Sequence, residues 1–522
     1  MGLQENQVKM MMLRARILDL ETGASVVLIN EADGDTMNVH PGDRVTLRSS
    51  SRSIVAIANL TTIIERGLVG LTKDVNDELG AKNGDAVEAL LSKQPKSLAA
   101  IKDKLNGKRL DYDEIYEIVK DAVNKKLDRN ELTAFVVALH AYGLDLEESE
   151  YMSMAMVKTG ETLGLKKKRI FDKHSIGGVP GDKTTLLVVP IIAAAGLTIP
   201  KTSSRAITSA AGTADRAEVL MPVDLSAKEM VGVVEKTNGC IVWGGAVHMA
   251  PADDIFIRIE YPFSIDPLLL PSIISKKKAA GSTDMVLDIP IGQNAKVKNK
   301  EDAWALTKDF SALGERMGIR IRGAVTYGEQ PIGYAIGAAA EAREALRVLH
   351  YRNTVPDLVD KATSIAGMLL EMGGKENGKK LAKSIIEKGM AEQKLRQIID
   401  EQGGDPKIKP DDIQLGRYSS IIESEVDGRI MAIDNLVLAY GTRLAGAPKI
   451  KSAAIIMHKK LGDNVKKGEP MATVYSDSTS ALKDAERYIL DNAGIVAASG
   501  SSMLLKEIRI EKMQQRGFVL ER

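Results

Sequence analysis

Alternating apolar and polar residues fill the first part of the chain, between residue 12 and about residue 94. Such alternation, broken by turns rich in Gly, Asp and Asn, predicts β-strands over residues 14–18, 25–29 and 44–47. The sequence Gly-Asp-Arg-Val at residues 42–45 returns as Gly-Asp-Ala-Val at residues 84–87, so a turn and the strand after it occur twice. This weak repeat indicates a duplicated small β-barrel.

A helical pattern replaces the alternation after the linker Gln94-Pro95-Lys96, because apolar residues now recur at spacings of three and four. Three Asp residues each precede a Glu by three positions, the capping box that begins a helix: Asp111 with Glu114, Asp128 with Glu131, and Asp145 with Glu148. Residues 96 to about 165 are therefore predicted to be helical. From Ile170 onwards, short apolar strands alternate with glycine-rich loops and helices, as in an α/β sheet.

Size and charge narrow the class of protein. A chain of 522 residues is too long for one hydrophobic core, and roughly three or four domains are expected. The formal net charge of +1 attracts neither nucleic acid nor a membrane, so an anion has to be caught by a local site. Cys240 is the only cysteine, which excludes an intramolecular disulfide. No stretch approaches the roughly 18 to 20 apolar residues of a membrane span, and we expect a cytoplasmic protein.

The most informative stretch is Arg-Ile-Phe-Asp-Lys-His-Ser-Ile-Gly-Gly-Val-Pro-Gly-Asp-Lys-Thr-Thr at residues 169–185. A strand, a glycine turn and a helix in this order aim backbone N–H groups at an anion, and Lys173 and Ser175 add a charge and a hydroxyl. Asp182 separates Gly181 from Lys183 and breaks the P-loop spacing, and the dinucleotide-binding spacing of glycines is missing as well. The loop is predicted to hold phosphate, whereas a tight turn without function is the alternative.

Small and hydroxyl-bearing residues form a second cluster after the next strand, at residues 203–215. They allow a ligand to approach the backbone closely, and Arg205 offers a forked donor suited to phosphate. Because Ser and Thr in loops often only cap turns, this cluster alone leaves the two interpretations about equal.

Together these motifs resemble the thymidine and pyrimidine-nucleoside phosphorylase family, with its Lys-His-Ser-x-Gly-Gly-Val-Gly-Asp signature, and more closely its archaeal branch of AMP phosphorylases. The resemblance runs from about Ser97 to the C-terminus and includes the glycine-rich helix start at residues 335–345. It implies a multi-domain α/β enzyme, a pentosyltransferase, with a split helical domain, a large α/β domain with a mixed sheet, and the active site between them.

The expected domains follow from the patterns and the resemblance together. They are a double-psi-barrel-like domain (1–94) with a structural or oligomerising role, two helical segments (95–165 and 250–280), two segments of the α/β domain (166–249 and 281–424) and a C-terminal α+β region (425–522). In that region, residues 462–470 resemble the turn of a lipoyl-like fold, which we interpret as structural because the carrier lysine is not recognisable.

The resemblance also assigns site residues. The orthophosphate ligands match Lys173, Ser175, Thr185, Ser203 and Thr213, and the base pocket matches Arg258, Ser272 and Lys276. The AMP contacts match Gly178, Ser204, Arg205, Ala206, Ile207, Thr208, Ser209, Thr213, Ser272 and Lys296. The resemblance implies that Asp266 is the proton donor and that it acts with Lys173 in catalysis. The residues themselves also allow Asp266 to be a cap of the helix near Pro267.

Two departures from the pyrimidine enzymes favour a nucleotide over a nucleoside. Pro180 is inserted in the signature, and Ser-Arg-Ala-Ile-Thr-Ser at residues 204–209 replaces Gly-Arg-Gly-Leu-Gly-His. The expected reaction converts AMP and phosphate to adenine and ribose 1,5-bisphosphate, without a metal or other cofactor, and we expect it to extend to CMP and UMP. A thymidine or pyrimidine-nucleoside phosphorylase, a Mg²⁺-dependent phosphoribosyltransferase and a regulatory nucleotide-binding protein are the alternatives. A homodimer or higher homo-oligomer is expected.

Overall fold

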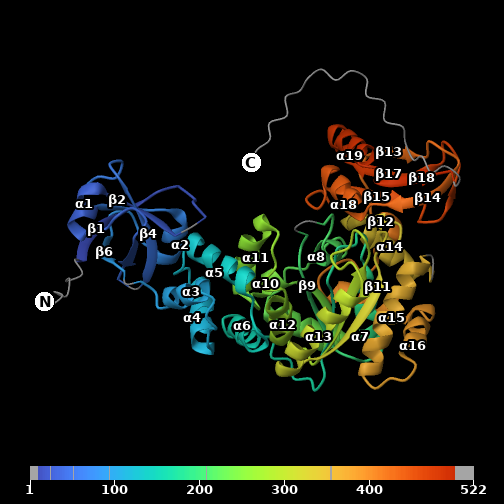
Figure 1. Cartoon of the computed structure of the whole chain (residues 1–522), viewed down its shortest axis with the longest axis horizontal. Coiled ribbons are helices and arrows are strands. Elements are labelled where there is room, and N and C mark those ends of the chain that lie inside the picture. Colours follow the sequence, from blue (N-terminus) through green and yellow to red (C-terminus); the bar gives the residue numbers. More distant parts are fainter. Residues whose placement is uncertain are drawn as a thin grey trace. The chain divides into compact units, whose positions relative to one another are not determined.

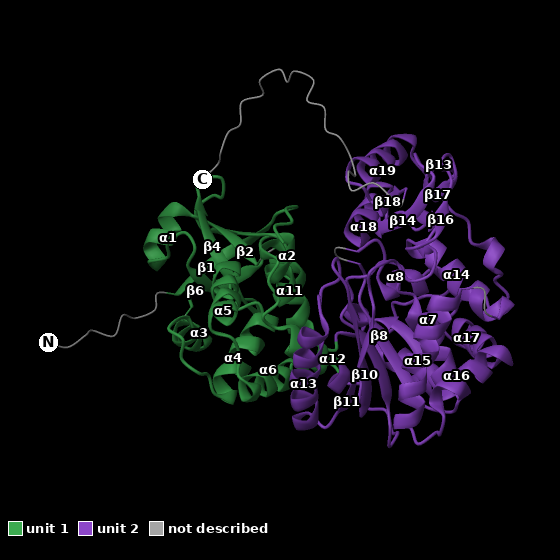
Figure 2. Cartoon of the chain, turned by 45° about the vertical axis from the view of Figure 1, so that its right-hand side comes forward, with its two compact units in different colours: residues 1–161, 249–276 green, residues 162–248, 277–522 purple. Residues whose placement is uncertain are grey.

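The computed structural model of the chain describes residues 10–499 except residues 24, 51, 93, 207, 208, 353 and 354. The chain forms two compact units, coloured in Figure 2: Met1–Glu161 with Met249–Lys276, and Thr162–His248 with Lys277–Arg522. We call them unit 1 and unit 2. No helix among the described residues is long and apolar enough to cross a membrane.

Unit 1 begins with a closed six-stranded barrel of order β1-β5-β2-β4-β3-β6 (Figure 1). Its strands are β1 (Met10–Ile17), β2 (Val26–Asn30), β3 (Arg44–Arg48), β4 (Ser53–Thr61), β5 (Leu68–Leu71) and β6 (Ala86–Leu91), with the short helices α1 (Glu31–Met37) and α2 (Lys73–Leu79). The repeated turns at Gly42 and Gly84, with φ of 92° and 88°, lead into β3 and β6, which pair with each other. The barrel inferred from the repeat is confirmed.

After the barrel, unit 1 contains the helices α3 (Ser97–Leu105), α4 (Tyr112–Val123), α5 (Arg129–Tyr142), α6 (Leu146–Lys158) and α11 (Pro251–Phe263). Each of the three Asp-x-x-Glu sequences forms a complete capping box, at the starts of α4, α5 and α6, as predicted. One apolar core joins the helices before residue 161 to α11, with the rings of Phe135 and Phe256 6.0 Å apart. Helix α12 (Leu269–Ala279) follows α11.

The α/β part of unit 2 contains two parallel sheets, of order β11-β10-β7 and β8-β9. The strands are β7 (Phe171–Ser175), β8 (Ile199–Ser203), β9 (Gly239–Trp243), β10 (Asp284–Ile291) and β11 (Arg320–Tyr327). The helices are α7 (Thr184–Ala194), α8 (Thr213–Ala217), α9 (Ala227–Thr237), α10 (Gly244–Val247), α13 (Lys300–Arg316), α14 (Ala338–Tyr351), α15 (Pro356–Met372), α16 (Gly378–Glu387) and α17 (Met390–Glu401). Helix α7 is apolar on every side, and it lies in the core against α15 and α17.

The C-terminal part of unit 2 is built from antiparallel strands, two α-helices and the short 3-10 helix η1. Its elements are η1 (Pro410–Asp412), β12 (Ala335–Ile336), β13 (Tyr418–Glu423), β14 (Gly428–Ile433), α18 (Asn435–Leu444), β15 (Ala454–Met457), β16 (Asn464–Val465), β17 (Pro470–Ser476), α19 (Thr479–Asp491) and β18 (Ile495–Ala498). Strand β12, from the glycine-rich segment before α14, pairs with β15. Parallel and antiparallel pairs thus both occur in this unit, and the predicted fold class is confirmed.

Candidate active site

The predicted phosphate loop joins the carboxyl end of β7 to the start of α7. Gly177, Gly178 and Gly181 have φ of 82°, 88° and 76°, a region that residues with a side chain rarely adopt. A Cβ on Gly181 would lie 2.6 Å from the carbonyl oxygen of Ile332. The glycines therefore give the loop a backbone path that is strained for residues with a side chain.

A cluster of four buried, charged side chains includes Asp182 of this loop. The Lys173 Nζ lies 3.6 Å from Asp182 Oδ2 and 3.5 Å from Asp288 Oδ2, while Lys361 Nζ lies 3.6 Å and 2.9 Å from the same two atoms. Burial acts to raise the pKa of Asp182, but Lys173 and Lys361 lower it well below its usual value. Burial likewise acts to lower the pKa of Lys361, and Asp182 and Asp288 raise it. The two lysines and the two aspartates therefore stabilise one another's charges in the interior.

The predicted phosphate ligands lie at corresponding positions of two strand–helix connections. Ser175 and Ser203 are the last residues of β7 and β8, and Thr185 and Thr213 lie in the first turns of α7 and α8. Strands β7 and β8 begin side by side, since the Phe171 N–H donates to the Thr198 carbonyl at 2.8 Å. The hydroxyls thus lie at the carboxyl ends of their strands or in the first turns of the helices that follow, and their assignment as phosphate ligands stays a prediction.

Asp215 organises the second cluster. Its Oδ2 accepts hydrogen bonds from the N–H groups of Ala206 and Gly212, both at 2.8 Å, and its Oδ1 lies 3.5 Å from the Arg205 guanidinium. A Cβ on Gly212 would lie 2.5 Å from the Ser204 carbonyl oxygen, so the turn is tight. Ile207 and Thr208 lie outside the described residues. Asp215 was missed by sequence reasoning, although an acid three residues after Gly212 has the spacing of a helix cap.

Arg205 was predicted to contact the substrate, and in the structure its guanidinium binds carboxylates of the protein. It donates to both oxygens of Glu218, at 2.8 and 2.6 Å, and to Asp224 at 3.1 Å, and it lies over the Trp243 ring. Lys451 also pairs with Glu218 and Asp215. These contacts fit a side chain that holds the loop in place, and the predicted contact with the nucleotide stays a prediction.

The backbone of Lys296 packs against the phosphate loop. It follows the carboxyl end of β10, the strand that pairs with β7, and a Cβ on Gly178 would lie 2.7 Å from its amide nitrogen. The structure thus brings together two of the predicted AMP contacts, Gly178 and Lys296. The Lys296 side chain is exposed.

The predicted base-pocket residues and proton donor lie in unit 1. Ser272 and Lys276 are one helical turn apart on α12, and the Lys276 ammonium forms an ion pair with the buried carboxylate of Asp253 on α11. Arg258 on α11 and Asp266 in the α11–α12 connection are exposed. Asp266 does not lie in α12, which begins at Leu269, but its carbonyl accepts from the Leu269 N–H at 3.3 Å.

Glu260 is a further acid of this region that sequence reasoning missed. It is 4% exposed, and burial, followed by the charges of Asp266 and Asp253, raises its pKa to about 8. In the part of the chain that the structure describes, no three His, Cys, Asp or Glu side chains come together as metal ligands would. A reaction without a metal stays a prediction.

Comparison with known proteins places these residues in a family context. Three family descriptions match: "Glycosyl transferase family, helical bundle domain" at residues 98–160, "Glycosyl transferase family, a/b domain" at residues 167–392, and "Pyrimidine nucleoside phosphorylase C-terminal domain" at residues 430–496. The chain is 49% identical to an AMP phosphorylase from Thermofilum pendens over 98% of this chain and 100% of that protein. It is 48% identical to an AMP phosphorylase from Pyrococcus furiosus, over 90% and 95% of the two chains.

A solved anthranilate phosphoribosyltransferase from Thermus thermophilus is 19% identical, with a TM-score of 0.49, over 58% of this chain and 99% of that one.

Proposed function

The chain belongs to the AMP phosphorylase family, and on that premise we propose that it catalyses the phosphorolysis of AMP. Identity of 49% over the whole length of a relative of that name is the observation that carries the proposal. The reaction breaks the bond between C1' and the base nitrogen, forms a bond between C1' and a phosphate oxygen, and yields adenine and ribose 1,5-bisphosphate.

The residues of the two units have different roles in this proposal. Lys173, with Ser175, Thr185, Ser203 and Thr213, holds orthophosphate, because backbone N–H groups and hydroxyls at a helix start favour an anion. A phosphate oxygen next to C1' stabilises the positive charge that develops there and then attacks it. Asp266 donates a proton to the departing base, and Arg258, Ser272 and Lys276 hold that base.

The test is a product assay with AMP, adenosine and inorganic phosphate. With both AMP and phosphate present we expect adenine and a bisphosphorylated pentose in equal amounts, and with phosphate omitted we expect neither. Equal turnover of adenosine and AMP would contradict a nucleotide substrate. Adenine formed without phosphate would point to hydrolysis instead.

A pyrimidine substrate is the second candidate, because residues 430–496 match the C-terminal domain of pyrimidine nucleoside phosphorylases. CMP, UMP, uridine and thymidine in the same assay separate the possibilities. Faster turnover of uridine or thymidine than of any nucleotide would favour a nucleoside phosphorylase, whereas CMP and UMP turnover would broaden the nucleotide range. A dependence on Mg²⁺ and a diphosphorylated sugar would favour a phosphoribosyltransferase.

Homo-oligomerisation through the barrel also remains a proposal. Every assigned site residue follows residue 94, so removal of residues 1–94 is expected to change the assembly more than the chemistry. Light scattering and a single-turnover assay on the same truncated protein test this together. An unchanged oligomer size would reject the proposed role of the barrel. The predicted cytoplasmic location stays a prediction.

A further inference from the structure

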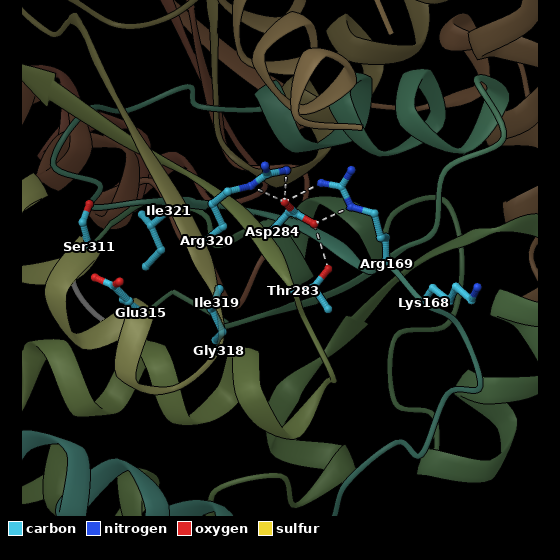
Figure 3. Close-up of a pocket in the computed structure, with 10 residues that line it drawn as sticks. All are labelled: Lys168, Arg169, Thr283, Asp284, Ser311, Glu315, Gly318, Ile319, Arg320 and Ile321. Atoms are coloured by element: carbon cyan, nitrogen blue, oxygen red, sulfur yellow. Dashed lines mark hydrogen bonds and ion pairs between the residues drawn. The ribbon is translucent and has the colours of Figure 1, made fainter. Parts of the chain in front are cut away.

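A polar pocket lies in unit 2, at the amino ends of the parallel strands β7, β10 and β11 (Figure 3). Its volume is about 630 Å³, within the range of small-molecule sites. It is lined by Lys168, Arg169, Thr283, Asp284, Ser311, Glu315, Gly318, Ile319, Arg320 and Ile321. The phosphate loop follows the carboxyl end of β7, so the two sites are separated by a five-residue strand, roughly 15 Å long.

Two arginines in this pocket share one buried carboxylate. Arg169 donates from Nε to Asp284 Oδ2 at 3.0 Å and from Nη2 to Oδ1 at 2.6 Å, and Arg320 donates from Nε and Nη2 to Oδ1 at 2.8 and 2.6 Å. The Asp284 side chain is 3% exposed, whereas those of Arg169 and Arg320 are 40% and 58% exposed. Burial acts to raise the pKa of Asp284, but Arg169, Thr283 and Arg320 lower it, so the carboxylate keeps its charge.

This arrangement fixes two guanidinium groups without using all of their donors. Among the described residues, the bonds to Asp284 and the bond from Arg320 to the Met372 carbonyl use Nε and Nη2 only. The Nη1 groups remain for a ligand. Two guanidiniums on one carboxylate leave one positive charge in excess, and Lys168, which also lines the pocket, adds another.

We propose that this pocket binds a small phosphate ester that also carries hydroxyl groups, such as a nucleoside monophosphate or a phosphorylated pentose. The guanidinium forks of Arg169 and Arg320 match the geometry of a phosphoryl group, and because Asp284 holds them in advance, less side-chain freedom is lost on binding. Ser311 and Glu315 line the other side of the pocket, where they can bind hydroxyls (Figure 3). The Glu315 carboxylate repels a ligand that is charged throughout, such as a bare polyanion, and accepts hydrogen bonds from the hydroxyl groups of an ester.

The test is the stoichiometry of AMP binding to the full-length protein, measured by calorimetry without added phosphate. We expect two equivalents per chain in the intact protein. Arg320→Ala should weaken the binding of the second AMP by at least about tenfold, and Lys168→Ala should weaken it several-fold. Both variants should leave turnover at saturating AMP unchanged. Lys168→Ala leaves the Asp284 interactions in place, so its effect does not depend on the folding of the Arg320 variant.

Arg322→Ala is the matched control, because Arg322 lies two residues further along β11, is 48% exposed and pairs with Glu371 outside the pocket. The Arg322→Ala protein should still bind two equivalents of AMP per chain. A single equivalent in the intact protein, or a second equivalent that neither pocket variant weakens, would overturn the proposal. Titration with inorganic pyrophosphate and with ribose 5-phosphate separates the ligand classes: tighter binding of pyrophosphate at this site would overturn the assignment to a hydroxyl-bearing ester.

Discussion

Replacing Gly178 by Ala tests how closely the phosphate loop packs on the Lys296 segment. The added Cβ would lie 2.7 Å from the Lys296 amide nitrogen, so one of the two backbone segments has to move by about 0.7 Å to reach the 3.4 Å of an ordinary contact. Misplacement of reacting groups by about 1 Å can cost on the order of 10²-fold in rate. We therefore expect kcat/KM for AMP to fall about 10- to 100-fold.

Gly177→Ala is the matched control for backbone strain. Gly177 also has a positive φ, 82° against 88° for Gly178, but a Cβ there meets nothing within 4 Å. Both variants should lose about 1 to 2 kcal/mol of unfolding free energy through strain, measured by urea unfolding. Steady-state assays on the two proteins then isolate the packing effect. Equal kcat/KM values for the two variants would refute the idea that the contact with Lys296 positions the loop.

Four further predictions concern charged groups. Lys173→Ala should raise the KM for phosphate and severely reduce turnover, and unchanged rates at low phosphate would reject Lys173 as a phosphate ligand. The same change should cost about 3 to 5 kcal/mol of unfolding free energy, because Asp182 and Asp288 lose a buried partner. Arg205→Ala should lower kcat/KM for AMP and for adenosine by similar factors, because Arg205 holds the loop, and Lys451→Ala should do the same. A loss with AMP alone would instead identify a contact between Arg205 and the 5'-phosphate. Asp266→Asn should reduce the rate by about 10² to 10⁴ and remove the basic limb of the pH profile, and near-normal activity would make Asp266 a helix cap. Folding raises the pKa of Glu260 from 4.5 to about 8, so the unfolded state loses this proton first and the free energy of unfolding should decrease as pH rises from about 4.5 to 8. Thermal unfolding across this pH range should show the decrease. A Glu260→Gln protein with the same pH dependence would contradict the prediction.

Local patterns predicted the elements of this protein well, because they depend on residues only a few positions apart. Each Asp-x-x-Glu box begins a helix, since the two side chains and the N–H groups that they bind lie within one turn. The glycines of the phosphate loop have positive φ because a tight turn between strand and helix requires it. The resemblance to the phosphorylases, carried by these loops, was enough to identify the family.

Only the tertiary structure decided which charges meet. The register between β7 and β10 brings Asp288 to Lys173, and α15 brings Lys361 to Asp288 and Asp182. In the sequence, Asp288 was merely an acid within an apolar strand. Arg205 has the chemistry of a phosphate ligand, but the fold surrounds it with Glu218, Asp224 and Asp215. The sequence determines which local structures and chemical groups exist, whereas long-range strand pairing and helix packing determine their partners, because the electrostatic energy of a buried charge depends on neighbours that are distant along the chain.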